Sequence, residues 1–255
     1  MLFRSSEHNV LYIVEGSSEK RLLSRLWSRF EPDNVYDVYE YNTNIHVLIG
    51  LLFEDGELDE DLELVRTLRS NERDESKRET LKKKFEYVYM IFDFDPQDDR
   101  VNYERIAKMM DFFNDPAGNG RLYLNYPMIE SYRHVSSLND VEFKDKKVTL
   151  ALLKEGRYKQ LVEEESTAEL KQLNNYTEVT FSELIRMHLR KRHYIISGEY
   201  APLRYDDIVN DLDSQLLMEQ VRCLNTEGML FVINTCIFTI AEHMPSRFVE
   251  EKNLS

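Results

Sequence analysis

Two apolar runs of the chain each end in acidic residues, and this pairing constrains the fold more than any other feature of the sequence. Residues 10–14 lead directly into Glu15, and residues 87–92 lead into Asp93 and Asp95. Short apolar runs of this kind are typical of buried strands. In open α/β sheets, ligands bind beyond the carboxyl ends of the strands. The two runs therefore predict that carboxylates from separate strands meet at one edge of a sheet.

The spacing of apolar residues predicts an alternation of strands and helices over the first half of the chain. The expected strands are residues 9–14, 35–41, 87–92 and 121–126. Helical spacing predicts helices around residues 22–30, 58–68 and 106–113, the first with Ser17 or Ser18 as its N-cap. Such alternation is typical of α/β proteins. We expect a mainly parallel four-stranded sheet flanked by helices.

The pattern changes after Pro127, where the remaining segments are mostly helical in spacing. The expected helices are residues 150–165, 181–194 and 206–243, with a break near residues 225–228. Thr180 and Glu183 fit a capping box at the start of the second of these. We therefore expect a sheet domain at residues 1–127 and a mostly helical C-terminal region at residues 128–255, packed on it.

The charge balance limits the classes of function. The net charge is −14, from 47 acidic and 33 basic residues, which counts against a protein that coats nucleic acid nonspecifically. It does not exclude an enzyme that meets nucleic acid through one local basic patch. The two cysteines, Cys223 and Cys236, have no metal-ligand spacing, so we expect buried free thiols.

The longest apolar stretch, residues 229–241, is too short to span a bilayer. The chain also opens with no signal peptide. We therefore expect a cytoplasmic protein without a membrane partner.

The acidic residues at the two strand ends have the chemistry of a divalent-cation site. On an extended backbone Asp93 and Asp95 would point the same way, and carboxylate pairs of this kind bind Mg²⁺ or Mn²⁺. Glu15 would ligate metal or transfer a proton, and Glu19, one helical turn later, would add a ligand. Taken singly these signals are weak, because paired aspartates after a strand are most often a turn or a helix cap. Their occurrence at two strand ends favours the metal site.

At these residues the chain resembles the TOPRIM family, over roughly residues 8–126. This fold is shared by topoisomerases, bacterial primases, overcoming-lysogenization-defect nucleases and small abortive-infection effectors. The resemblance implies a TOPRIM-like catalytic domain at residues 1–127 in which Glu15 has acid–base or metal roles and Asp93 and Asp95 hold Mg²⁺. In the nuclease branch of the family a second glutamate also contacts the metal. Glu19 matches the position of this second glutamate less closely than the other residues match theirs.

The chain lacks the zinc-binding cysteines of a primase, and a P-loop that would mark an ATPase domain. It is most similar to defence-associated TOPRIM effectors such as the TOPRIM subunit of the PARIS anti-phage system. The resemblance implies a Mg²⁺- or Mn²⁺-dependent endonuclease acting on RNA such as tRNA, or on DNA, as a toxic effector of abortive infection. A separate ATPase subunit is the implied partner, and self-association is left open.

Further polar residues follow the fourth expected strand and the aspartate pair. Two interpretations of Glu130 are equally favoured. It is either a catalytic carboxylate that positions metal or water, or an acid that stabilises the start of a helix. His134 is expected to be structural. Asp98 or Asp99 is expected to cap a helix, and Arg100 would bind either a phosphate or one of these aspartates.

A basic stripe is predicted on the helix at residues 181–194. It consists of Arg186, Arg190, Lys191, Arg192 and His193. One interpretation is a docking strip for a nucleic-acid backbone. The alternative is an exposed helix face whose charges are balanced by nearby acids.

Two other functions remain open on sequence grounds. The chain could be a non-catalytic adaptor on a TOPRIM scaffold that binds a partner ATPase, with the apolar segment 229–241 as its interface. It could also be a receiver-like or phosphatase-like protein using Asp93, but the lysine and hydroxyl residues that such a site needs are not evident.

Overall fold

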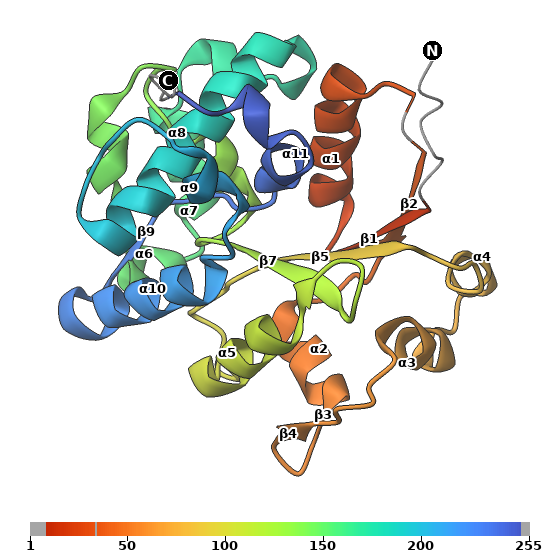
Figure 1. Cartoon of the computed structure of the whole chain (residues 1–255). Helices are drawn as coiled ribbons and strands as arrows, with labels where there is room; N and C mark the ends of the chain where they lie inside the picture. The colour runs from red at the N-terminus through yellow and green to blue at the C-terminus, as the bar shows by residue number, and fades with distance from the viewer. Residues whose placement is uncertain (1–8, 34, 251–255) are drawn as a thin grey trace.

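A computed structural model describes residues 9–33 and 35–250 and has a five-stranded sheet at its centre (Figure 1). The strand order is β2-β1-β5-β7-β6. Their bounds are β1 Val10–Val14, β2 Tyr36–Glu40, β5 Tyr87–Asp93, β6 Asn114–Asp115 and β7 Gly120–Asn125. The first four strands in this order are parallel, and only the short edge strand β6 is antiparallel. The four predicted strands are confirmed, and β6 is an addition to them.

Helices cover both faces of the sheet. α1 (Ser17–Phe30) and α11 (Phe238–His243) lie on one face, and α2 (Ile45–Leu52), α3 (Leu64–Asn71) and α5 (Tyr103–Phe112) lie on the other (Figure 1). Since β1 leads to β2 on one side and the chain then returns to β5 on the other side, the strand order reverses between β1 and β5. Such a reversal point is where open α/β sheets bind ligands, in the crevice beyond the strand ends.

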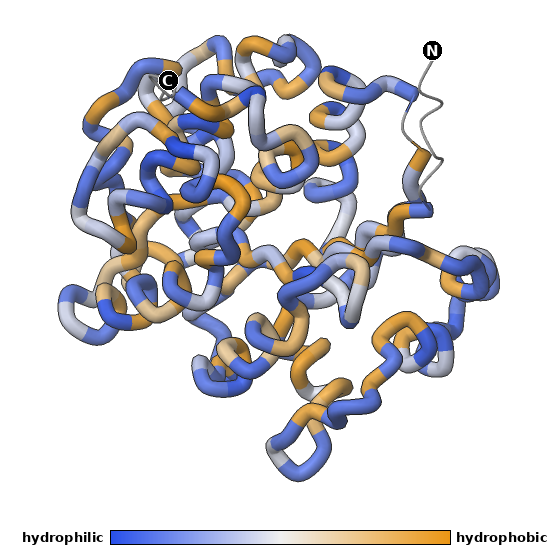
Figure 2. The backbone as a smooth tube through the Cα atoms, in the orientation of Figure 1, coloured by the Kyte–Doolittle hydropathy of each residue, from blue (hydrophilic) through white to orange (hydrophobic). Residues whose placement is uncertain are grey.

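The crossover between β2 and β5 differs from the expectation. Its first helix, α2, was not predicted, and Figure 2 shows α2 in the hydrophobic colour along much of its length. The helix expected at residues 58–68 is wrong in its first half. Leu58 belongs to a short hairpin, and helix α3 begins only at Leu64. The remaining elements of this crossover are β3 Phe53–Glu54, β4 Glu57–Leu58 and α4 Glu75–Thr80.

The C-terminal half is mostly helical, as expected, but more interrupted. Its elements are η1 Ile129–Arg133, η2 Val141–Asp145, β8 Lys147–Thr149, α6 Leu150–Lys154, α7 Tyr158–Glu165, η3 Ala168–Leu170, η4 Leu173–Asn175, α8 Glu178–Ser197, α9 Tyr205–Val209, α10 Asp213–Glu227, β9 Met229–Phe231, α11, and η5 Pro245–Arg247. The helix expected at 150–165 is two helices, because Gly156 adopts a left-handed conformation (φ +69°) between them.

The segment 229–241 is not one helix, contrary to the expectation. Gly228 ends α10 at φ +66°, within the predicted break, and the chain then forms β9, which pairs antiparallel with β8. Leu230 and Ile240 are completely buried. The apolar segment is therefore part of the core, which removes it as the exposed interface of the adaptor hypothesis.

Two predicted helix caps are also wrong. The capping box of α8 lies at Thr177 and Thr180, one turn before the predicted position. At α1 the N-cap is Gly16 rather than Ser17 or Ser18, and the Glu19 carboxylate accepts the Gly16 N–H at 2.8 Å. A carboxylate in the first turn accepts a hydrogen bond from a backbone N–H that has no partner within the helix. Its negative charge is also stabilised by the positive end of the helix dipole.

The buried side chains of the two halves form one continuous hydrophobic cluster. The boundary expected near residue 127 is crossed by a backbone pairing between Tyr126 and Ile233. Cys223 and Cys236 are buried and free, as predicted. Among the described residues, no helix combines the length and apolar composition that crossing a bilayer requires.

Candidate functional site

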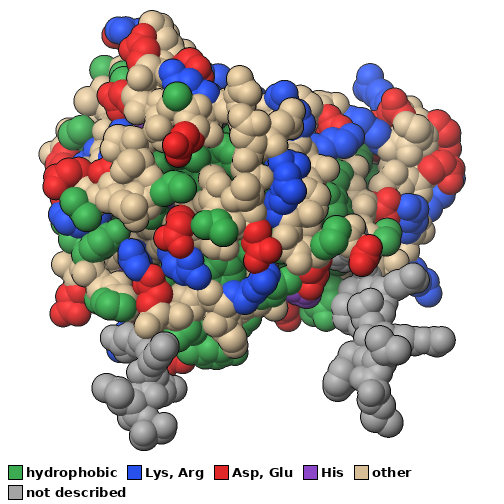
Figure 3. Space-filling model, turned by 90° about the horizontal axis from the view of Figure 1, so that it is seen from above, with side chains coloured by type: hydrophobic (Ala, Val, Ile, Leu, Met, Phe, Trp, Pro, Cys, Tyr) green, Lys and Arg blue, Asp and Glu red, His purple; other side chains and the backbone are tan. Residues whose placement is uncertain are grey.

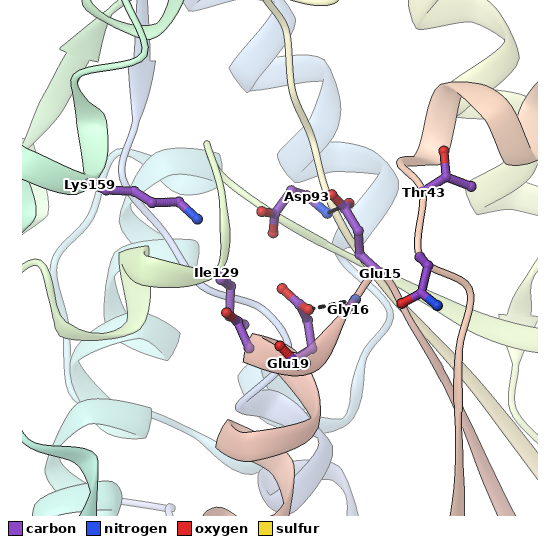
Figure 4. Close-up of a pocket in the computed structure, with 10 residues that line it drawn as sticks. Glu15, Gly16, Glu19, Thr43, Asp93, Ile129 and Lys159 are labelled. Carbon is purple, nitrogen blue, oxygen red and sulfur yellow. Dashed lines mark hydrogen bonds between the residues drawn. The ribbon is translucent and has the colours of Figure 1, made fainter.

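A cavity of about 330 Å³ lies beyond the carboxyl ends of β1 and β5, at the reversal point of the sheet. Three carboxylate residues line it, Glu15, Glu19 and Asp93. In Figure 4, Asp93, Glu19 and Lys159 point toward one another from three different elements. The other lining residues are Gly16, Ser17, Ser18, Asn42, Thr43 and Ile129.

The parallel pairing of β1 with β5 brings Glu15 and Asp93 together. Val14 is paired with Ile91, so that Glu15 and Asp93 follow at neighbouring strand ends. The Glu15 backbone N–H donates to the Ile91 carbonyl at 3.1 Å, and the Glu15 Oε2 accepts the Asp93 backbone N–H at 3.2 Å (Figure 4). The sequence prediction that these two residues meet at one edge of the sheet is confirmed.

Asp93 is a buried carboxylate of the cavity, with 8% of its surface exposed, and Glu19 beside it is buried as well. Its Oδ1 accepts one hydrogen bond, at 3.4 Å, from the side-chain amide of Asn125 on the adjacent strand β7. Burial first, and then the negative charges of Glu15 and Glu19, raise the pKa of Asp93 well above its ordinary value. A carboxylate in this position is costly to ionise unless a cation accompanies it.

The other two carboxylates of the cavity are perturbed in the same direction. Burial, followed by the charge of Asp95, raises the pKa of Glu15 from 4.5 to about 7. Burial also raises the pKa of Glu19, although its bond to the Gly16 N–H opposes the shift. Clustered titratable groups with raised pKa values in a cavity are a recurrent property of functional sites.

Asp95 departs from the prediction. The strand ends at Asp93, and Asp95 has a left-handed backbone conformation with φ +44°, so that the two aspartates do not alternate on one extended segment. The Asp95 Oδ1 accepts from the Gln97 side chain at 3.0 Å, and Asp95 does not line the cavity. Phe94 is fully buried, as expected. Asp95 therefore acts on the cavity through its charge on Glu15 rather than from its wall.

Glu130 and Lys159 form an ion pair at the rim. Glu130 lies in the short 3-10 segment η1, and its Oε1 is 3.0 Å from the Lys159 Nζ. The Glu130 Oε2 is buried and has no hydrogen-bond partner. Burial lowers the pKa of Lys159, but Glu130 and the cavity carboxylates outweigh this and raise it. Lys159 was not identified from the sequence, since it comes from α7 with no local motif.

The remaining polar residues near the aspartates have structural roles. His134 is buried and bonded to Tyr158 and Glu165, as expected for a structural histidine. Asp98 binds the Arg100 guanidinium, while the N-cap of α5 is Asn102 rather than an aspartate. Arg100 is therefore paired within the chain.

The predicted basic stripe is contradicted by the structure. Lys191 and Arg192 are completely buried, because α8 is enclosed by the C-terminal elements. The Lys191 Nζ donates to the carbonyls of Phe143 and Lys146, and the Arg192 Nη2 to that of Asp207. The other members pair with carboxylates: Arg186 with Glu183, Arg190 with Glu250 and His193 with Asp207. The face shown in Figure 3 likewise has acidic and basic side chains intermixed.

The chemistry of the cavity's polar groups is compatible with a hard divalent cation, but these groups do not form a complete coordination shell. They include carboxylate oxygens, which Mg²⁺ prefers, and burial followed by the mutual repulsion of the carboxylates raises their pKa values. No group of three or more Asp, Glu, His or Cys residues in 9–33 and 35–250 is arranged to hold a metal. Mg²⁺ commonly binds a protein through one or two carboxylates and keeps several waters, so the fit of these residues to such a cation is one of chemistry.

No family model, curated protein or solved structure matches the chain. The TOPRIM resemblance accordingly rests on the residues of its two acidic motifs.

Proposed function

We propose that the chain is a Mg²⁺- or Mn²⁺-dependent nuclease that hydrolyses phosphodiester bonds in RNA or DNA. The observation that supports the proposal most is the convergence of Glu15, Glu19 and Asp93 in one cavity at the reversal point of the sheet. Of these, Asp93 and Glu19 would hold the cation. When bound, the cation would neutralise charge on the scissile phosphate and favour the ionised form of its bound water.

Glu15 is suited to accept the proton of the attacking water. Its carboxylate lies in the cavity wall beside Asp93, and burial raises its pKa to about 7 when no cation is bound, so that its neutral form is accessible after it takes up a proton. The water oxygen forms a bond to phosphorus, the proton passes to the Glu15 carboxylate, and the bond from phosphorus to the leaving oxygen breaks. The hydrogen bond from the Asp93 N–H holds the Glu15 carboxylate in place for this transfer.

Lys159 is suited to contact the phosphate. Its ammonium group points into the cavity from the side opposite Glu15 (Figure 4). Because the charge on the phosphate oxygens grows as water attacks, a fixed cation beside them stabilises the transition state. The wider role implied by the TOPRIM resemblance, an anti-phage effector with a separate ATPase partner, forms part of the same proposal.

The proposal is tested by incubating the full-length protein with tRNA, single-stranded DNA and plasmid DNA, each with Mg²⁺, with Mn²⁺ or with EDTA. We expect cleavage of at least one substrate that requires the divalent cation. Glu15→Gln should lower the initial rate by about 10²–10⁴-fold, the range for loss of a general base. Cleavage that persists in EDTA, or an unchanged rate in Glu15→Gln, would contradict the assignment.

A further inference from the structure

A second groove, of about 440 Å³, adjoins the acidic cavity. Its walls come from α1, η1 and the chain around η4. Ser18 and Ile129 line both the groove and the acidic cavity, so that the two form one continuous surface. Figure 4 shows Ile129 beside Glu19 at this junction. A ligand lying in the groove would therefore lead into the candidate site.

The groove differs from the rest of the chain in charge. Its charged lining residues are Arg21, Arg25, Arg133, Lys171 and Glu130. Four are cations and one is an anion, and the anion is already paired with Lys159. In a chain whose net charge is −14, this local surplus of positive charge favours a polyanionic ligand.

Arg21 and Arg25 lie one turn apart on α1, about 6 Å along the helix axis. Arg21 is exposed, and it makes no ion pair with any residue in 9–33 or 35–250. The Arg25 Nη2 donates to the Asn174 and Tyr176 carbonyls, while its buried Nε has no partner. The first of these arginines is free to bind a ligand, and the second is held in place with one donor unused.

Arg133 and Lys171 leave a further charge uncompensated. The Arg133 Nη1 is 3.1 Å from Glu163 Oε2, and the Lys171 Nζ is 3.7 Å from Glu163 Oε1. One carboxylate thus serves two cations. The groove keeps a net positive charge even when every ion pair within it is counted.

We infer that this groove binds the sugar–phosphate backbone of a nucleic-acid strand and leads it to the acidic cavity. The inference that the strand is led to the acidic cavity rests on the proposed function. The inference that the groove binds nucleic acid does not. Arginines in a row are suited to successive phosphates, and such contacts position a strand without reading its bases. This groove would take the role that one of the two interpretations of the sequence gave to the basic stripe on α8.

Binding is measured by fluorescence anisotropy with labelled single-stranded RNA, single-stranded DNA of the same sequence, and the corresponding duplex. EDTA is present throughout, so that cleavage does not consume the probe. Arg21→Glu should weaken binding of the preferred strand by roughly tenfold and reduce the slope of log K against log salt by about 0.7 or more. The matched control is Arg66→Glu on α3, which makes the same charge change at an exposed site away from the groove.

Three results would contradict the proposal that the groove binds nucleic acid. They are no binding of any nucleic acid by the wild-type chain, equal weakening by Arg21→Glu and Arg66→Glu, and equal competition by a poly-glutamate peptide. Circular dichroism of both variants shows whether they are folded, and Arg21→Lys should restore part of the affinity if charge is what matters. Loss of binding in Arg21→Glu, with no cleavage under any condition, would support the groove while rejecting the nuclease.

Discussion

Asp93→Asn is expected to lower the rate of nucleic-acid cleavage by roughly a thousandfold or more. The substitution removes the charge of a buried carboxylate of the cavity whose pKa the neighbouring carboxylates raise, and on which cation binding would depend. The fold should persist, because asparagine keeps an oxygen that can accept the hydrogen bond from Asn125. Initial rates at saturating Mg²⁺, together with the midpoint of thermal unfolding, separate loss of activity from loss of structure.

The matched control is Asp99→Asn, an exposed aspartate that follows the same strand but does not line the cavity. We expect its rate to stay within about twofold of the wild type, since exposed charges interact weakly. If Asp93→Asn cleaved as fast as Asp99→Asn, Asp93 would have no part in the chemistry.

Without divalent cations, the free energy of unfolding is expected to fall as the pH rises from about 4.5 to about 7, the interval between the ordinary and folded pKa values of Glu15. The pKa of Glu15 is raised in the folded state, so the folded chain binds its proton more tightly than the unfolded chain. The resulting stability is fully present below pH 4.5 and is lost as the pH passes the folded pKa. The charges facing Glu15 are those of Asp93 at the end of β5, Asp95 two residues later, Glu19 on α1 and Lys159 on α7.

The expected contribution of Glu15 is on the order of 2 kcal/mol, after allowing for its partial contact with solvent. Chemical denaturation at several pH values measures it. Glu15→Gln should reduce the pH dependence by the contribution of this one group, and the exposed control Glu104→Gln should leave it unchanged. Mg²⁺ should stabilise the wild type more above pH 7 than below pH 5, because protons compete for the same carboxylates. A pH dependence that is the same in wild type and Glu15→Gln would show that Glu15 titrates normally.

The four parallel strands were predictable, because β1, β5 and β7 contain short apolar runs and β2 mixes aromatic and apolar residues with acidic ones. The short polar edge strand β6 carries no such pattern. Helix α2 was not predictable, since Ile45–Leu52 is apolar almost throughout and lacks the periodicity that marks an amphipathic helix. The helix expected over residues 229–241 failed for a different reason. Pairing with β8, which is 80 residues away in the chain, makes Met229–Phe231 a strand.

The site was predictable as far as it depends on strand ends. Glu15 and Asp93 meet because parallel strands end at the same edge, which the sequence pattern indicates. The position of Asp95 depends on a left-handed backbone conformation. Aspartate tolerates this conformation, but the presence of an aspartate does not predict it. Lys159 reaches the cavity from α7 through tertiary packing alone.

The basic residues show the limit of charge patterns. Lys191 and Arg192 have the spacing of an exposed stripe, yet both are buried, and backbone carbonyls accept their hydrogen bonds. Arg21 and Arg25 are only two basic residues on an amphipathic helix. By itself this pattern indicates only a solvent-exposed helix face. Their position beside the acidic cavity becomes evident only when α1, η1 and η4 are brought together.

Calorimetric titration of Mn²⁺ and Mg²⁺ into the full-length protein tests most directly whether the acidic cavity is a cation site. We expect saturable binding by the wild type that Asp93→Asn weakens by about 10–100-fold or more and that Asp99→Asn leaves unchanged. Absence of binding by the wild type, or equal binding by the wild type and Asp93→Asn, would contradict a divalent cation held by Asp93 and Glu19.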